Sequence, residues 1–234
     1  GTEARARYRD WVENQRTYVH TTSRERLGYI HVPDMSSAGY AEFVRGFLAE
    51  LDREGLVIDV RYNSGGHVSP LLIDRLARRR AGAEHGRWSG RAPYPAEAPR
   101  GPMAALVNEH TGSDGEIFSH LFRARGCGPL IGTRTWGGVI ATWPRHRLVD
   151  GTVTTQPEFR YFLTGVGDGL ENRGVEPDIV VESKPAHHDG DVQLETAVRY
   201  LLSNLSEPAG AHAQAGEELP SLAAAARWDA TCLH

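Results

Sequence analysis

The chain has 234 residues, 40% of them apolar, and a formal net charge of -4, which suits one large or two small globular domains with a proper core. A negative balance with only short basic runs argues against nucleic acid as a partner. No apolar stretch reaches the eighteen or so residues that span a bilayer, so no membrane segment is expected. The only cysteines, Cys127 and Cys232, have no zinc or disulfide spacing, which favours a reducing, cytoplasmic setting.

Apolar periodicity and turn residues predict strands that alternate with helices. The expected elements, in chain order, are a helix over 3–18, a strand over 27–32, a helix over 40–51, a strand over 56–60, a helix over 69–80, a strand over 103–109, a helix over 114–125, a strand over 129–133, a hairpin within 147–163, a strand over 178–181 and a helix over 192–205. Such alternation predicts an α/β fold with a mostly parallel sheet.

Three segments stand outside this pattern. Residues 82–102 are rich in glycine, proline and alanine without a period, which predicts a long surface loop or insertion. Residues 206–234 have the composition of a flexible C-terminal tail. The chain begins without Met at a charged helical segment, 1–26, so we expect it to be part of a longer polypeptide and 27–205 to be its core domain.

The segment NEHTGSDGEIFS, residues 108–119, carries the most chemical information. It places Ser113 between an apolar strand and a helix that begins at Asp114. A strand-turn-helix context lifts a hydroxyl out of the backbone and directs the first free N–H groups of the helix toward the group it attacks, as a serine nucleophile requires. The alternative is that Ser113 only caps the helix, with Glu116 completing a capping box.

A second strand-turn-helix site is DVRYNSGGH, residues 59–67. Its adjacent glycines could turn a backbone N–H toward a ligand, and Gly66 is one candidate donor. The alternative is a tight turn with no ligand. Turns at the carboxyl ends of parallel strands form the ligand crevice of open α/β sheets, so the presence of two such turns in one chain favours a functional site.

GLENRGVEPDIVV, residues 169–181, supplies a carboxylate. Glu171 could lie at the rim of the same crevice and orient a histidine or a water. The alternative is a surface ion pair with Arg173. Of the eleven histidines, His67 and His110 lie nearest Ser113 in sequence, but neither is an obvious general base. Lys184, the only lysine, lies too far along the chain to suggest a Ser-Lys dyad.

The segments GYIHVPDM, GFLAELDREGLVIDVRYNSGGHVS, NEHTGSDGEIFS, GPLIGTRTWGGVI, LVDGTVTTQPEF and ENRGVEPDI occur in this order across about residues 27–182. Together they resemble the core catalytic domain of the tricorn proteases, within the wider group of C-terminal processing peptidases. The match is long and far more specific than a single serine motif.

The resemblance implies a crotonase-like (ClpP/crotonase-type) α/β core and a serine endopeptidase that acts on oligopeptides. It implies that Ser113 is the nucleophile, that the N–H groups of Gly66 and Asp114 form the oxyanion hole, and that Glu171 belongs to the catalytic tetrad. It also implies a homo-oligomer, expected to be a hexamer, and neither a metal nor an organic cofactor.

The chain departs from the family in one respect. The base histidine of the tricorn family lies in a helical domain upstream of a PDZ domain and after β-propellers, and this sequence contains none of them. We therefore expect the fragment alone to be inactive, with 1–26 as the junction leaving the upstream region. Two rival functions stay open at this point: a crotonase-type acyl-CoA enzyme, and a non-catalytic peptide-binding or assembly module.

Overall fold

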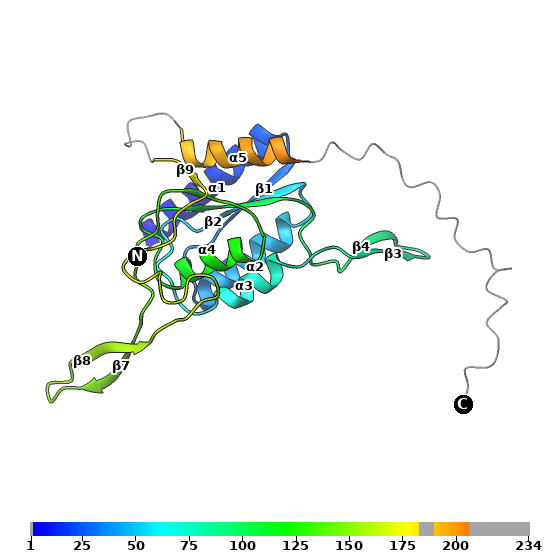
Figure 1. Cartoon of the computed structure of the whole chain (residues 1–234). Helices are drawn as coiled ribbons and strands as arrows, with labels where there is room; N and C mark the ends of the chain where they lie inside the picture. The colour runs from blue at the N-terminus through cyan, green and yellow to red at the C-terminus, as the bar shows by residue number, and fades with distance from the viewer. Residues whose placement is uncertain (1, 183–189, 206–234) are drawn as a thin grey trace, which may run out of the picture.

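The computed structural model describes residues 2–182 and 190–205, which build a parallel five-stranded sheet covered on both faces by helices (Figure 1). The strands of the sheet, in the order β1-β2-β5-β6-β9, are β1 (Leu27–His31), β2 (Gly55–Asp59), β5 (Met103–Val107), β6 (Leu130–Gly132) and β9 (Ile179–Val180). Every neighbouring pair in this sheet runs parallel. The expectation of an α/β fold with a mostly parallel sheet is therefore confirmed.

The helices form two layers. Figure 1 shows α1 (Thr2–Ser23) and α5 (Val192–Asn204) on one face of the sheet, and α2 (Ser37–Glu50), α3 (Ser69–Leu76) and α4 (Asp114–Ala124) on the other. Because all neighbouring strands run parallel, each connection returns the chain to the end of the sheet where the previous strand began. The turns that follow β1, β2, β5 and β6 therefore lie together along one edge, at the carboxyl ends of the strands.

Alternation along the strands explains why both faces are buried. Ile30 and Ile58 point into the cluster that includes Phe43, Phe47 and Phe118 from the helices of one layer. Their neighbours Tyr29 and Val57 point the other way, into a cluster with Leu194 and Leu201 of α5. Successive side chains of a strand lie on opposite faces, so a strand with consecutive apolar residues, such as Leu56, Val57 and Ile58 of β2, needs a helix layer on each side.

Two hairpins project from this body (Figure 1). One pairs β7 (Ala141–Arg147) with β8 (Val153–Phe159) around the Asp150-Gly151 turn, as predicted, although its first strand begins earlier than expected. The other pairs β3 (Gly82–Gly86) with β4 (Gly90–Tyr94). A long surface loop or insertion was predicted over 82–102, and the first half of this segment is a hairpin rather than a loop without strands. The hairpin has no apolar alternation because both of its faces are largely exposed.

Other bounds differ by five residues or fewer. Helix α3 ends at Leu76 rather than Arg80, and the Arg79 guanidinium donates to the Leu76 carbonyl at 3.4 Å, where it satisfies the helix end. Helix α1 runs to Ser23 and contributes Val19 to the core, so this helix packs on the sheet. The boundary drawn after residue 26 stays a prediction. The expected tail, 206–234, and Lys184 lie outside the described residues, among which no helix is long and apolar enough to cross a membrane.

Candidate active site

The turns that follow β1, β2, β5 and β6 are held together by hydrogen bonds between their backbones. The Met35 N–H donates to the Gly65 carbonyl at 2.8 Å, and the Gly112 N–H donates to the Asn63 carbonyl at 2.9 Å. The Trp136 N–H reaches the Thr111 carbonyl at 3.0 Å. The four turns therefore form one hydrogen-bonded edge.

Asn63 is the centre of this edge, a role that the sequence did not reveal. Its side chain is fully buried and donates to the Val32 carbonyl at 2.8 Å, while its Oδ1 accepts from the Gly65 N–H at 2.9 Å. The second bond is the turn that asparagine makes to its own backbone two residues on. Asn63 thus fixes the conformation of the glycine pair and joins it to the end of β1.

Ser113 occupies a backbone conformation that few residues other than glycine adopt. Its φ is +52° and its ψ is -123°, at the first turn of α4. Such a strained position persists only where its surroundings hold it, and it is typical of the sharp strand-to-helix turn that presents a nucleophile. The residue is partly exposed, whereas most of α4 behind it is buried.

The capping alternative for Ser113 describes only part of what is seen. The Glu116 N–H faces the Ser113 side chain as in a capping box, but its hydrogen bond, at 2.9 Å, goes to the Ser113 backbone carbonyl, and the hydroxyl makes no hydrogen bond among the described residues. The reciprocal half of a capping box is present, since the Ser113 N–H donates to the Glu116 carboxylate at 3.1 Å. The hydroxyl is therefore left for another use.

The glycine pair packs directly against the Ser113 turn. A Cβ added to Gly65 would lie 2.5 Å from the Ser113 Cβ and 3.0 Å from the Asp114 nitrogen. Gly65 has a φ of +89°, and a Cβ on Gly66 would fall 2.1 Å from the Met35 carbonyl oxygen. Only glycines allow the two turns this approach, and it brings the Gly66 loop beside the N-terminus of α4.

The Gly66 and Asp114 N–H groups are not used by the bonds that hold these turns. Gly66 forms a parallel bridge with Met35 in which the neighbouring Gly65 carbonyl and His67 N–H make the hydrogen bonds. Asp114 is the first residue of α4, where the backbone N–H has no partner within the helix. Its carboxylate turns away and accepts from the Ser69 hydroxyl at 2.5 Å and the Ser69 N–H at 3.0 Å, which ties α4 to α3.

Glu171 is held by backbone N–H groups rather than by an arginine. One carboxylate oxygen accepts from Val139 at 2.8 Å and from Ile140 at 2.9 Å, and the Asn172 N–H donates to the Gly137 carbonyl at 2.8 Å. The alternative, an ion pair with Arg173, is not formed within the described chain. The Glu171 loop therefore braces segment 137–140, which leads from the Ser113 edge into β7.

The candidate histidines do not complete a catalytic pair among the described residues. His67 is exposed, and His110 stacks its ring on Tyr62 with centroids 5.5 Å apart. Neither is hydrogen-bonded to the Ser113 hydroxyl. His187 and His188 lie outside the described residues.

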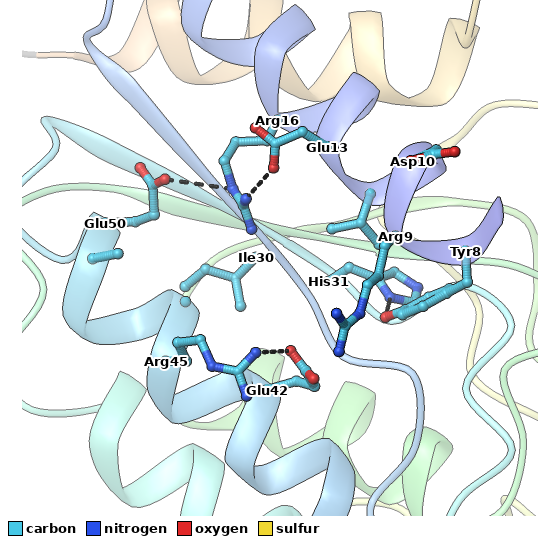
Figure 2. A pocket seen from close by; sticks show the side chains of 13 residues that line it. Tyr8, Arg9, Asp10, Glu13, Arg16, Ile30, His31, Glu42, Arg45 and Glu50 are labelled. Carbon is cyan, nitrogen blue, oxygen red and sulfur yellow. Dashed lines mark hydrogen bonds and ion pairs between the residues drawn. The ribbon is translucent and has the colours of Figure 1, made fainter. Parts of the chain in front are cut away.

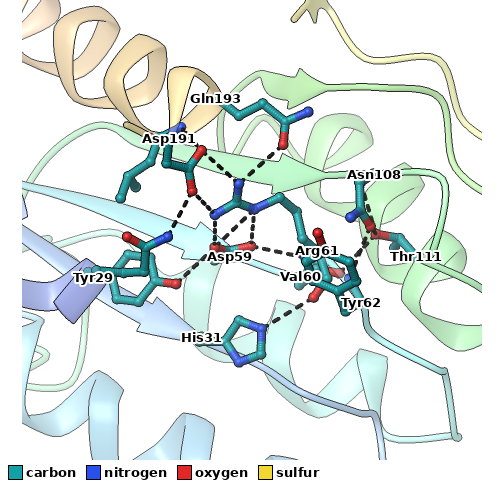
Figure 3. Close-up of polar contacts among 12 residues, drawn as sticks. Tyr29, His31, Asp59, Val60, Arg61, Tyr62, Asn108, Thr111, Asp191 and Gln193 are labelled. Carbon is teal, nitrogen blue, oxygen red and sulfur yellow. Dashed lines mark hydrogen bonds and ion pairs between the residues drawn. The ribbon is translucent and has the colours of Figure 1, made fainter. Parts of the chain in front are cut away.

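A buried ionic network supports the turn after β2 (Figure 3). Arg61 donates to Asp59 at 2.7 Å and to Asp191 at 2.9 Å, and the Tyr29 hydroxyl donates to Asp59 at 2.8 Å. Burial alone would raise the pKa of the Asp59 carboxyl, but the charge and hydrogen bonds of Arg61 hold that pKa below its ordinary value. The network joins β1, β2 and the N-terminus of α5, and Arg61 places it at the start of the turn that follows β2.

His31 lies beside this network and should make the free energy of unfolding depend on pH. Burial lowers the pKa of His31, whose ring is hydrogen-bonded to the Tyr8 hydroxyl at 2.7 Å and to the Arg61 carbonyl at 3.2 Å. The unfolded chain takes up this proton at a pH near 6.5, before the folded chain does. We therefore expect the free energy of unfolding to fall as pH drops through about 6.5.

Denaturant titrations between pH 8 and 5 measure how the free energy of unfolding changes with pH. The variant His31→Gln keeps one acceptor and one donor but cannot titrate, so its free energy of unfolding should no longer fall near pH 6.5. An unchanged slope in the variant would assign the pH dependence to another group.

A cavity of about 560 Å³ lies between α1 and α2 (Figure 2). Several of its charged groups pair with one another, as in Arg16 with Glu13 at 2.6 Å and Arg45 with Glu42 at 2.8 Å. It has no serine, threonine or cysteine in its lining. The candidate nucleophile Ser113 is not among the residues that line it.

Comparison with known proteins gives the chain a family. The model of peptidase family S41 matches residues 26–181. Tricorn protease homolog 1 of Streptomyces coelicolor is 49% identical over 203 residues, which cover 86% of this chain and 19% of that protein. Tricorn protease of Thermoplasma acidophilum is 48% identical over 203 residues, which cover 85% of this chain and 19% of that protein.

The solved crystal structure of the tricorn protease superposes with a TM-score of 0.82 at 48% identity, over 85% of this chain and 20% of that chain. The resemblance found in the sequence is thus confirmed. This chain spans about a fifth of the length of these curated relatives. With the matched residues running from the start of β1 to the end of β9, the chain belongs to peptidase family S41.

Proposed function

We propose that this chain is the nucleophile-bearing domain of a serine endopeptidase that hydrolyses oligopeptides. The observation that carries the proposal is the conformation of Ser113, a partly exposed serine at φ +52° whose turn touches a glycine pair. Membership of family S41 and the tricorn relatives support the same reaction. The fold is of the crotonase type in this proposal, since that type also sets two N–H groups at strand ends around one carbonyl oxygen.

The proposed reaction uses an acyl-enzyme. The Ser113 oxygen attacks the peptide carbonyl carbon, and the carbonyl oxygen takes up negative charge between the Gly66 and Asp114 N–H groups. The C–N bond then breaks, and the amine leaves with a proton returned by the general base. Water attacks the resulting ester by the same route and frees Ser113.

The general base comes from outside this chain in this proposal. A histidine from the upstream region of the longer polypeptide would take the Ser113 proton, so the 234-residue fragment alone is inactive. Glu171 contributes as the acidic member of the tetrad through its hold on segment 137–140. The whole enzyme would be a cytoplasmic homo-oligomer, a hexamer by family resemblance, with the helical, PDZ and propeller domains upstream.

Substrate would bind in an extended conformation along residues 135–138. This segment lies next to the Ser113 turn, through the Trp136 N–H bond to Thr111, and leads outward to β7. Pairing of a peptide with a backbone segment gives affinity without demanding particular side chains. That property suits an enzyme acting on mixed oligopeptides.

An assay of the full-length polypeptide with two substrate classes tests the proposal. Fluorogenic oligopeptides should be hydrolysed and acyl-CoA thioesters should not be turned over. Turnover of the thioester alone would favour the crotonase-type enzyme, and peptide binding without turnover of either would favour a non-catalytic module. The isolated chain serves as the control, and peptide hydrolysis by it would refute an upstream base.

A further inference from the structure

Glu116 is a fully buried carboxylate that accepts four hydrogen bonds. They come from the Thr135 hydroxyl at 2.6 Å, the Gly137 N–H at 2.6 Å, the Gly138 N–H at 2.8 Å and the Ser113 N–H at 3.1 Å. No basic side chain pairs with it in the described part of the chain. Its charge is balanced by these donors and by its place in the first turn of α4.

The four donors belong to two different segments. Ser113 lies in the nucleophile turn, and the other three lie in segment 135–138, about twenty residues further on. Thr135 is fixed in turn, because its hydroxyl oxygen accepts from the Val175 N–H at 2.7 Å. One carboxylate therefore sets the nucleophile turn and segment 135–138 at a fixed separation.

Segment 135–138 can meet the carboxylate only because it contains two glycines. Gly137 has a φ of +93°, and a Cβ on Gly138 would lie 2.5 Å from the Trp136 ring. Both N–H groups thus turn inward to one side chain. A buried charge that loses such a donor is costly, so the two segments cannot move independently.

We infer that Glu116 is a positioning residue that couples substrate binding on segment 135–138 to the geometry of Ser113. This inference rests on the proposed function. The N–H groups of segment 135–138 are bonded within the protein, to Val175, Thr111 and Glu116, so a paired peptide would donate to carbonyl groups of this segment. It would thereby hold Gly137 and Gly138 in place, these would hold the Glu116 carboxylate, and the carboxylate would hold the Ser113 N–H. Binding energy from substrate residues remote from the cleaved bond thereby helps to position Ser113. Longer peptides should therefore have a higher kcat, and not only a lower KM, than short ones.

Glu50 offers a matched control. It is also a buried glutamate, 4% exposed, and it accepts from His20 at 3.0 Å and Arg53 at 3.2 Å. It touches Gly28 near the amino end of β1, whereas the Ser113 turn lies beyond the carboxyl end of the strands. Its replacement tests the loss of a buried carboxylate without touching the proposed site.

The experiment compares Glu116→Gln with Glu50→Gln in the full-length polypeptide. Each variant is assayed on a short fluorogenic peptide and on an extended one that can pair with segment 135–138. A glutamine amide turns an NH₂ group against at least one of the N–H donors, and misplacement of a reacting group by about 1 Å costs on the order of 100-fold. We expect Glu116→Gln to lower kcat on the extended peptide by about 100-fold and to remove its advantage over the short peptide.

Glu50→Gln should leave the ratio of kcat values for the two peptides as in the unchanged protein, even if it lowers the melting temperature. An unchanged ratio in folded Glu116→Gln would overturn the inference. Should that variant fail to fold, Thr135→Val removes one of the four donors to Glu116, together with the acceptor of the Val175 N–H. The ratio of kcat values for the two peptides should then fall by about tenfold, and an unchanged ratio would also overturn the inference. If the unchanged protein hydrolyses neither peptide, the proposed function itself fails, which is a separate outcome.

Discussion

Replacement of Ser113 by alanine is expected to lower kcat for peptide hydrolysis by about 10⁴-fold or more in the full-length polypeptide. The variant loses the attacking oxygen and keeps the rest of the site. Alanine at φ +52° is as strained as serine, and the hydroxyl makes no cap hydrogen bond, so folding should be unaffected. Steady-state rates together with thermal melting of both proteins measure this.

Ser64→Ala is the matched control, because Ser64 is an exposed hydroxyl on the adjoining glycine turn. It should retain nearly all of the activity. Equal rates for Ser113→Ala and the unchanged protein would refute the nucleophile, and loss of activity in both variants would point to a general disturbance of the edge.

The second large effect is expected at the oxyanion hole. Gly66→Ala should lower kcat by about 10² to 10³-fold, because its added Cβ would fall 2.1 Å from the Met35 carbonyl oxygen and force the loop and its N–H to move. Gly66 also has a φ of +151°, which L side chains rarely adopt. KM should change much less than kcat, since the lost interaction forms with the charged intermediate.

Gly82→Ala provides the comparison for this change. A Cβ at that position meets nothing within 4 Å, and its backbone is not in the positive-φ region. It should leave kcat unchanged. A Gly66→Ala variant with full kcat would show that the Gly66 N–H does not bind the oxyanion.

Much of the body could be predicted from the sequence because local signals agree with the packing. The strand MAALV is apolar at every position and LVID at every position but Asp59, and in the structure both are buried on two faces. The serine turn and the glycine pair could be predicted because each follows such a strand and opens a helix. The strand, the turn and the start of the helix all lie within about ten residues of sequence, so the pattern can be recognised locally.

Two features could not be predicted, for different physical reasons. The β3–β4 hairpin, GAEHGRWSGRAPY, is largely exposed on both faces. Its sequence therefore lacks the alternation of apolar and polar residues that would predict the two strands. The contacts of Glu116 depend on residues 135–138, which the fold brings back to α4 through β6. A capping box accounts for one of its four bonds, and sequence spacing gives no sign of the other three.

The most direct test of the account is to map a covalent adduct on the full-length polypeptide. Treatment with a peptidyl phosphonate that reacts with activated serines, followed by mass spectrometry of the digest, should locate the adduct on Ser113. The same treatment of Ser113→Ala should give no adduct, and a competing oligopeptide should slow labelling of the unchanged protein. An adduct on another residue, or hydrolysis that continues after Ser113 is fully modified, would contradict it.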